Sequence, residues 1–186
     1  MTSGMVADAT QDRRRDQIRA LALRLFRERG YDRTALREIA AELGLSKSGL
    51  YHHFPSKDSL LSSLVDPLLD RLEELLDSAP ATLSTPQEKQ DFLTRYVDVL
   101  IEHREVVGLL SSDIAVRSHP ASGVRLHELT ETLYRRLAGQ SAGLPERVKA
   151  AHALIGLQDA VGRFADSDVT VVRDISLSVA FAVVNS

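Results

Sequence analysis

Residues 34–57, TALREIAAELGLSKSGLYHHFPSK, decide the fold of this chain. Four apolar residues in it recur at helical spacing: Leu36, Ile39, Ala40 and Leu43. Thr34 is the expected N-cap of this helix, and Gly44 is the kind of residue that ends one. Ser46 is a preferred N-cap as well, so a second short helix is predicted over residues 47–53. The stretch therefore predicts two helices joined by a tight turn.

The second of these helices is expected to have one anchored face and one polar face. Leu50 and Phe54 are its inward residues. Its outward residues are polar: Lys47, Ser48, Tyr51, His52 and His53. A helix-turn-helix needs this arrangement, because its second helix is held on one side and presents hydrogen-bond donors to the DNA major groove on the other. The stretch is therefore predicted to bind DNA.

The surrounding residues 24–61 resemble the N-terminal segment of the TetR family of bacterial transcriptional regulators. The matching pieces are Leu25-Phe26, Gly30-Tyr31, Thr34, Ile39-Ala40, Gly44-Leu45-Ser46, Leu50-Tyr51-His52-His53-Phe54 and Ser56-Lys57. So many matches at fixed spacing over about forty residues are more specific than any single short motif. The resemblance covers roughly the first third of the chain.

The resemblance implies an all-α fold of about nine helices. An N-terminal three-helix, helix-turn-helix DNA-binding domain is expected over residues 13–57, after a disordered leader over residues 1–12. A helical ligand-binding and dimerisation domain is expected over residues 58–186. The implied function is a homodimeric repressor that leaves a palindromic operator in double-stranded DNA when a small apolar effector binds.

The positions that match operator-contacting residues of the family are Lys47, Ser48, Tyr51, His53 and Lys57, and the further candidates for DNA contact are Arg37, Ser46, Gly49 and His52. Lys47 has the reach for a guanine edge or a phosphate, and Tyr51 and Lys57 suit phosphate oxygens. Gly49 allows close approach of the backbone to the sugar-phosphate chain. Only one of His52 and His53 can face the groove squarely, and His53 is favoured. The alternative for all of them is a solvated polar helix.

Charge is divided unevenly along the chain. The formal net charge is −3, yet residues 1–60 carry eleven Lys and Arg against eight Asp and Glu, and residues 61–186 carry twelve against eighteen. A basic N-terminal part is expected where one end of a protein meets a polyanion. The run Arg13-Arg14-Arg15 fits either a solvated helix start or an arm that touches phosphate or the minor groove.

Other classes of function lack their motifs. With no cysteine, neither a disulfide nor a thiolate metal site can form. No apolar signal core is present, and no apolar run approaches the ~20 residues that span a bilayer, so a cytoplasmic location without a membrane partner is expected. Catalytic and phosphate-binding motifs are missing, and His119 and His127 lack a third ligand. We expect no enzyme activity, no metal and no cofactor.

Beyond residue 57 the chain reads as a series of helices. Periodicity predicts them near residues 57–76, 87–103, 106–118, 126–137 and 145–164. Residues 170–184 are rich in β-branched side chains, which favour strands, but no other segment could pair with a strand, so a last helix is predicted. Pro67 predicts a kink, interpreted either as curvature around the core or as a hinge.

Polar side chains on apolar helices predict a ligand pocket in this second part. The six candidates form two sets, each on one helix face: Tyr96, Leu100 and His103, and His127, Thr130 and Tyr134. Such groups orient a guest in an apolar pocket. The alternative is that each residue lies at the rim of a filled core. The expected guest is small, apolar, and neutral or anionic.

The last two helices are the predicted dimer interface. Small residues keep the first of them slim, and apolar residues supply area: Leu154, Leu157, Val161, Phe164, Ile175 and Val179. Two such helices and their symmetry mates would form a four-helix bundle that buries more than ~1,200 Å². The alternative is that both helices close the core of one chain. A rival function is a helical small-molecule-binding or scaffold protein that no longer binds DNA.

Overall fold

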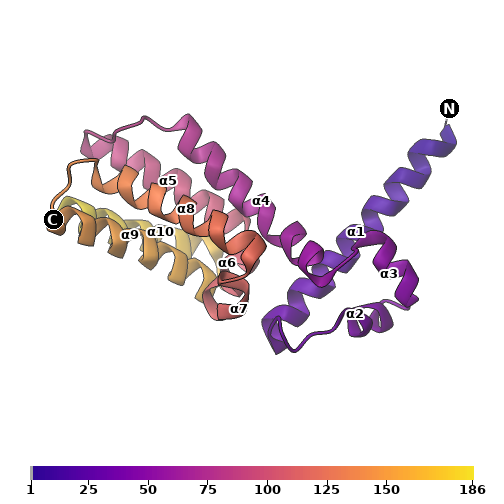
Figure 1. The fold of residues 1–186 in the computed structure, drawn as a ribbon. Coiled ribbons are helices and arrows are strands. Elements are labelled where there is room, and N and C mark those ends of the chain that lie inside the picture. Colours follow the sequence, from indigo (N-terminus) through magenta and orange to yellow (C-terminus); the bar gives the residue numbers. More distant parts are fainter. Residues whose placement is uncertain (1) are drawn as a thin grey trace. The chain divides into compact units, whose positions relative to one another are not determined.

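The computed structural model describes residues 2–186, and within this range it contains ten α-helices and no strand (Figure 1). The all-α fold class is therefore confirmed. The chain divides by contacts into two compact units, residues 1–65 and 66–186. The division falls inside helix α4 (Lys57–Ser78), whereas the sequence places the domain boundary at residue 57. Each unit has its own core.

The first unit is built from α1 (Thr2–Arg29), α2 (Leu36–Glu42), α3 (Lys47–His53) and the start of α4. Helix α1 begins at Thr2. From Thr2 onward the structure therefore has a helix where the sequence predicts a disordered leader over residues 1–12. No proline interrupts residues 2–29, so the helical hydrogen bonds can run on through the polar N-terminal stretch. Met1, the first residue of the expected leader, lies outside the described residues.

The core of the first unit forms from one face of each helix. Its fully buried residues include Ile18, Leu25, Phe26, Ile39, Leu50 and Phe54. The rings of Phe26 and Tyr31 meet edge to face with their centroids 5.1 Å apart, and the Tyr31 hydroxyl donates to Asp58 Oδ1 at 2.7 Å. These contacts fix the start of α4 to the loop after α1.

Thr34 is buried and does not cap α2, contrary to the prediction. Its hydroxyl donates back to the carbonyl of Gly30 at 2.9 Å, which closes the loop after α1. The N-cap position belongs to Ala35, whose backbone N–H donates to the Glu38 carboxylate at 2.7 Å. Threonine is a residue type that caps helices, but Thr34 lies one position before the actual N-cap.

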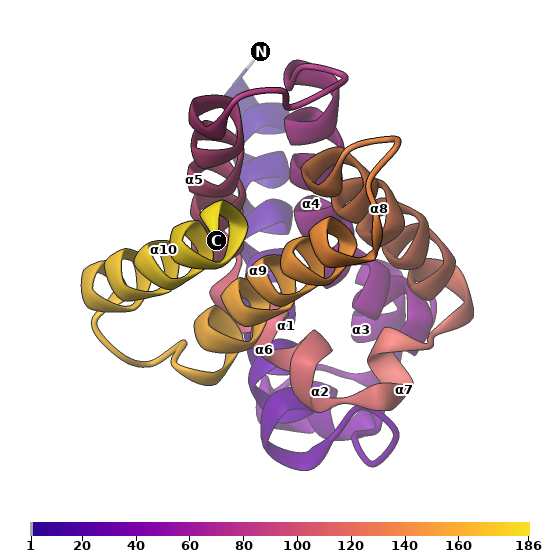
Figure 2. The ribbon, with the colours of Figure 1, turned by 90° about the vertical axis from the view of Figure 1, so that its left-hand side faces the viewer.

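The second unit contains the rest of α4 and six further helices: α5 (Pro86–Glu102), α6 (Arg104–Ser112), α7 (Ile114–Arg117), α8 (Pro120–Ala138), α9 (Leu144–Arg163) and α10 (Val169–Asn185). Helix α9 is central, because it packs on α5, α6, α8 and α10 (Figures 1 and 2). Helix α10 also contacts α5 (Figure 2). The β-branched segment at the C-terminus is a helix, as predicted.

Two glycines let α6 and α9 approach closely. A Cβ placed on Gly162 would lie 3.1 Å from the Cα of Gly108, and one on Gly108 would lie 3.0 Å from the carbonyl oxygen of Gly162. Side chains at either position would push the helices apart. The contact holds α6, and through it the start of α7, against the central helix.

The segment expected as one helix near residues 106–118 is two helices. Asp113 leaves the helical conformation, and its carboxylate accepts from the backbone N–H groups of Ala115 at 2.9 Å and Val116 at 3.4 Å. An aspartate at such a position caps a new helix. This break accounts for a total of ten helices in place of about nine. No helix in the described range is long and apolar enough to cross a membrane.

Candidate nucleic-acid interface and ligand pocket

A glycine turn and a serine cap set the angle between α2 and α3. Gly44 has φ +64°, and its N–H donates to the carbonyl of Ala41 at 3.1 Å, while Leu45 N–H donates to Ala40 at 2.8 Å. This pair of bonds is a Schellman motif, which a left-handed glycine permits. Ser46 Oγ then accepts from Gly49 N–H at 3.0 Å and caps α3, as predicted.

Helix α3 has the two faces that the sequence predicts. Leu50 and Phe54 are each 1% exposed and fix it to the core of the first unit. Ser46, Lys47, Ser48, Tyr51 and His52 are exposed. The Lys47 ammonium lies 5.7 Å from the centroid of the Tyr51 ring, so these two donors lie side by side. Arg37 on α2 is also exposed.

Gly49 has a structural reason besides the predicted one. A Cβ there would lie 3.2 Å from Ser46 Oγ, the atom that caps the helix. A larger residue would therefore crowd the cap. The position is only half-exposed, so close approach to DNA stays a prediction.

Of the two histidines, His52 is the exposed one and His53 is turned inward. His53 Nδ1 is buried and has no hydrogen-bond partner in the described part of the chain. Burial lowers the pKa of His53, and the nearby charges of His52, Arg15 and Arg14 lower it further. A half-buried ring suits packing better than groove contact, so exposure favours His52 over His53, and the DNA contact of either histidine stays a prediction.

Arg15 holds the end of α3 in place. Its guanidinium lies 4.9 Å from the centroid of the Phe54 ring and donates to the carbonyl of His53 at 3.2 Å. A cation is favourable at a helix C-terminus, where carbonyls lack partners. Of the Arg13-Arg14-Arg15 run, Arg13 and Arg14 are left for an arm that touches DNA, the alternative to a solvated helix start, and Arg14 donates to the side chain of Gln17 at 3.0 Å.

Lys57 also turns toward its own unit. Its ammonium lies 4.1 Å from the centroid of the Tyr31 ring and donates to the carbonyl of Asp32 at 3.4 Å. Both partners are in the loop between α1 and α2. Lys57 is predicted to contact phosphate, but its position indicates a second role as well. A cation on an aromatic face stabilises the fold.

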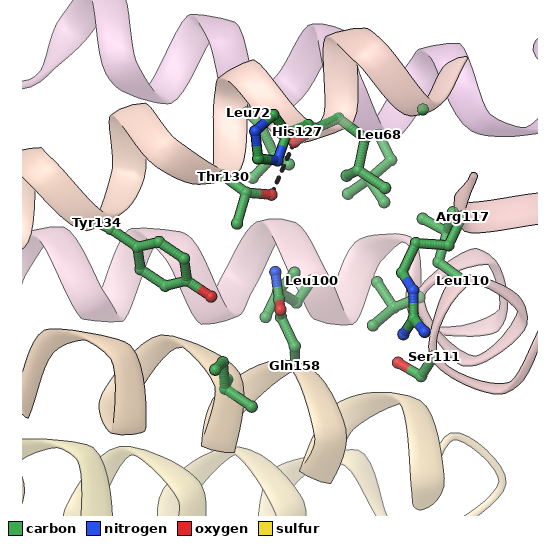
Figure 3. Close-up of a pocket in the computed structure, with 14 residues that line it drawn as sticks. Leu68, Leu72, Leu100, Leu110, Ser111, Arg117, His127, Thr130, Tyr134 and Gln158 are labelled. Atoms are coloured by element: carbon green, nitrogen blue, oxygen red, sulfur yellow. Dashed lines mark hydrogen bonds between the residues drawn. The ribbon is translucent and has the colours of Figure 1, made fainter. Parts of the chain in front are cut away.

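The second unit contains a cavity of about 420 Å³ between its helices (Figure 3). Leu100 from α5 and His127, Thr130 and Tyr134 from α8 line it, so four of the six predicted ligand residues meet there. Leu68 and Leu72 from α4 form another part of its apolar wall. The volume is within the ~300–1,000 Å³ of small-molecule sites.

The other two predicted residues do not line the cavity. Tyr96 is fully buried, and its hydroxyl has no hydrogen-bond partner within the described residues. Burial raises the pKa of Tyr96 and Tyr134 raises it further, while the nearby Gln158 side chain acts in the opposite direction. His103 lies at the junction of α5 and α6, where burial lowers its pKa. His103 lies seven residues after Tyr96, which places it at the end of α5 and not in the wall of the cavity.

Sequence reasoning missed Arg117, Ser111 and Gln158, which also line the cavity. They come from α7, α6 and α9, three helices whose rotation the apolar pattern alone does not fix. In Figure 3 the Arg117 side chain extends toward Ser111, and Gln158 reaches into the space between Arg117 and Tyr134. The signal available in the sequence was Asp113, a residue type that caps a helix, with Arg117 four residues after it.

A model of a known family matches the first unit. It is described as "Bacterial regulatory proteins, tetR family", and it covers residues 18–64, from α1 through the start of α4. Residues 18–64 of the chain therefore carry the N-terminal sequence of the TetR family.

Individual relatives cover different shares of this chain. The HTH-type transcriptional repressor KstR2 of Mycolicibacterium smegmatis is 34% identical over 108 residues, which is 56% of this chain and 51% of that protein. The match thus spans about half the length of that relative. The nucleoid occlusion factor SlmA of Vibrio campbellii is 24% identical over 178 residues, 88% of this chain and 89% of that one.

Solved structures extend the likeness of fold to both units. SCO3833 from Streptomyces coelicolor A3, a member of the TetR transcriptional regulator family, has a TM-score of 0.67 and 26% identity, over 89% of this chain and 88% of that one. PfmR, a TetR family transcriptional regulator from Thermus thermophilus, has a TM-score of 0.68 and 20% identity, over 91% of this chain and 97% of that one.

The predicted dimer residues fall into two groups. Leu154, Leu157 and Val161 are 1–2% exposed and belong to the core of the second unit, so their assignment to a dimer interface is wrong. Phe164, Ile175 and Val179 are more than half exposed. Leu154, Leu157 and Val161 belong to the buried face of α9, and α9 packs on α6 and α10.

Other apolar side chains on α9 and α10 are exposed in place of the buried three. Ile155 on α9 is 52% exposed, and Val171 on α10 is 53% exposed. Val171, Ile175 and Val179 recur every four residues and so form one row along α10. Gly156, next to Ile155, has open space beyond its Cα.

Proposed function

We propose that this protein is a DNA-binding transcriptional regulator, a homodimeric repressor that a small, largely apolar effector releases from a palindromic operator. The observation that carries the proposal is α3, which is fixed to a core by Leu50 and Phe54 and exposes Lys47, Ser48 and Tyr51 on its other side. A helix held in this way is free to enter a major groove.

The exposed residues of α3 divide into two roles. Lys47 is the candidate for a base edge, because a lysine can donate to guanine O6 and N7. Tyr51, Ser46 and Ser48 carry hydroxyls that suit phosphate oxygens, and Arg37 on α2 adds a phosphate clamp. His52 takes the place of His53 as the histidine offered to the groove.

Specificity requires two copies of α3. One seven-residue helix reaches only a few base pairs, too few to distinguish an operator in a genome. Two copies related by a two-fold axis would contact half-sites about 34–36 Å apart. We place the dimer interface on the exposed row Val171, Ile175 and Val179 of α10, together with Ile155 and Phe164. An exposed apolar row of this kind is typical of a surface covered by a partner.

Helix α4 is the element through which the cavity would act on DNA binding. It contributes Leu68 and Leu72 to the cavity and begins in the unit that contains α3. An effector that fits the cavity in only one position of α4 shifts the dimer toward that shape. The shift is limited by the difference in its affinity for the two shapes.

Sequencing the genomic DNA fragments that the purified protein retains tests the proposal. The expected result is enrichment of one inverted-repeat sequence, whose retention is lost in Lys47→Ala and kept in Arg147→Gln, an exposed arginine on α9. The rival function, a ligand-binding helical protein without DNA binding, shares the cavity but predicts no enriched sequence. Retention of DNA without any shared sequence would reject the operator part of the proposal.

A further inference from the structure

The cavity of the second unit has one charged residue in its wall. Among the residues that line it, Arg117 is the only Lys, Arg, Asp or Glu. None of the described residues that line the cavity is a carboxylate that could balance this cation. A guest that carries a positive charge would therefore meet repulsion and no counter-charge, whereas an anion would meet the guanidinium.

The guanidinium of Arg117 is available for a guest. It has no ion pair or hydrogen bond to any side chain in the described part of the chain, unlike Arg125 on the next helix, which binds Asp70 at 2.6 Å and Glu73 at 2.7 Å. Figure 3 shows Arg117 extending along the cavity toward Ser111. A planar guanidinium with a free hydroxyl nearby is a good receptor for a carboxylate.

The remainder of the wall determines the rest of the guest. Leucines from α4, α5 and α6 make most of its surface apolar, so the body of the guest must be apolar. Tyr134 and Gln158 are neutral hydrogen-bonding groups and lie away from Arg117 along the cavity (Figure 3). They match a carbonyl or hydroxyl group on the apolar body and do not call for a second charge.

We propose that this cavity binds an amphipathic monoanion, with its acidic group at Arg117 and Ser111 and its apolar body among Leu68, Leu72 and Leu100. The proposal names the class of effector and rests on the proposed function only for its regulatory meaning. Tyr134 and Gln158 select a neutral oxygen on the body. Recognition at Arg117 is at the exposed end, so the acidic group stays in contact with water.

Two fluorescent probes with the same ring system separate charge from apolar fit. The first, 8-anilinonaphthalene-1-sulfonate, is an anion, and the second, N-phenyl-1-naphthylamine, is its uncharged counterpart. Each is titrated into the full chain and into three variants, and circular dichroism checks that the variants fold. Arg117→Gln removes the charge, Arg147→Gln removes an exposed arginine outside the cavity, and Thr130→Phe fills the cavity.

The expected result is a loss of about tenfold in affinity for the anion in Arg117→Gln, as for a hydrogen bond to a charged group, with less than a twofold change for the neutral probe. Arg147→Gln is expected to bind both probes like the parent chain. Thr130→Phe is expected to lose both. The anion's advantage should also shrink as salt is raised.

Three results would overturn the inference. The first is an unchanged affinity of Arg117→Gln for the anion. The second is an equal loss of affinity for both probes in Arg117→Gln. The third is that the parent chain binds neither probe, or binds them in a way that Thr130→Phe does not abolish. Retention of operator DNA is measured separately on the same samples. Intact DNA binding with failed probe binding rejects this inference alone, and lost DNA binding with normal probe binding rejects the proposed function alone.

Discussion

Lys47 and Lys57 are the two lysines of the first unit that the sequence assigns to DNA, and the structure gives them different surroundings. Lys47 is exposed beside Tyr51, whereas the ammonium of Lys57 is placed on the Tyr31 ring and the Asp32 carbonyl. The same side chain chemistry therefore leads to two expected roles. The residue pattern cannot distinguish the two roles, because the position of the loop before α2 decides which lysine has a partner within the first unit.

Lys47→Met and Lys57→Met form a matched pair of variants. Lys47→Met is expected to weaken binding to operator DNA and to reduce the slope of log K against log salt by about one unit, since one phosphate or base contact is lost. Lys57→Met is expected to lower the stability of the first unit by about 0.5–1 kcal/mol, as for a cation on an aromatic ring, and to leave the slope unchanged. Anisotropy titrations and thermal melts measure the two effects, and a reversed outcome would exchange the roles.

His103 provides a test by pH at the same scale. Burial lowers its pKa in the folded chain, and its Nε2 is buried without a partner in the described residues. A lowered pKa means that the unfolded chain binds the proton more readily, so this contribution to stability is lost as pH falls through the unfolded value of about 6.5.

The melting temperature of the parent chain is therefore expected to fall between pH 7.5 and pH 5.5 more steeply than that of His103→Gln. The two curves should come closer at acid pH. His53, which burial also shifts downward, stays in both proteins and makes their shared slope. Parallel curves across this range would contradict the assignment to His103.

Among the helices, α8 binds α4 through the ion pairs of Arg125, and Arg136 on the same helix also donates to the Leu76 carbonyl of α4 at 3.1 Å. Arg125 donates to Glu73 through Nε at 2.8 Å and Nη2 at 2.7 Å, and to Asp70 at 2.6 Å, with Asp66 at 3.9 Å. The arginine holds the pKa of Glu73 below its usual range. Because the same two helices line the cavity, these ion pairs hold two of its walls together.

Arg125→Gln is expected to lower the melting temperature more than Arg135→Gln does. Arg135 lies on the same helix and makes only local contacts, to the Glu131 carbonyl and the Thr132 hydroxyl. The difference should shrink in 1 M salt, where partly exposed charges are screened. Equal melting temperatures at low salt would show that the ion pairs of Arg125 contribute nothing to stability.

The helices themselves were largely predictable, and their rotations were not. The bounds of α3 and the start of α4 follow from Ser46 and Lys57 as read, because caps and glycine turns act locally. The rotation of α9 depends on which apolar row meets α6, and Leu154 and Ile155 are equally apolar by sequence. The close contact of Gly108 with Gly162 selects the row, and it joins residues far apart in the chain.

For the whole molecule, the α10 row predicts a dimer that a single charge can break. Val179→Glu places a carboxylate in the proposed interface, where burial without a partner is costly. Val124→Glu is the matched control, since Val124 is 62% exposed on α8. Light scattering is expected to find a monomer for Val179→Glu and a dimer for Val124→Glu. Two dimers would move the interface away from this row.

Helix α3 is proposed to read DNA sequence, and the most direct test compares binding of one retained fragment with binding of a scrambled duplex of equal length. The parent chain is expected to bind the fragment at least about a thousandfold more tightly than the scrambled duplex at physiological salt. The double variant Lys47→Ala with Tyr51→Phe is expected to bind both equally weakly. Equal affinity of the parent chain for both duplexes, or full discrimination by the double variant, would contradict the account.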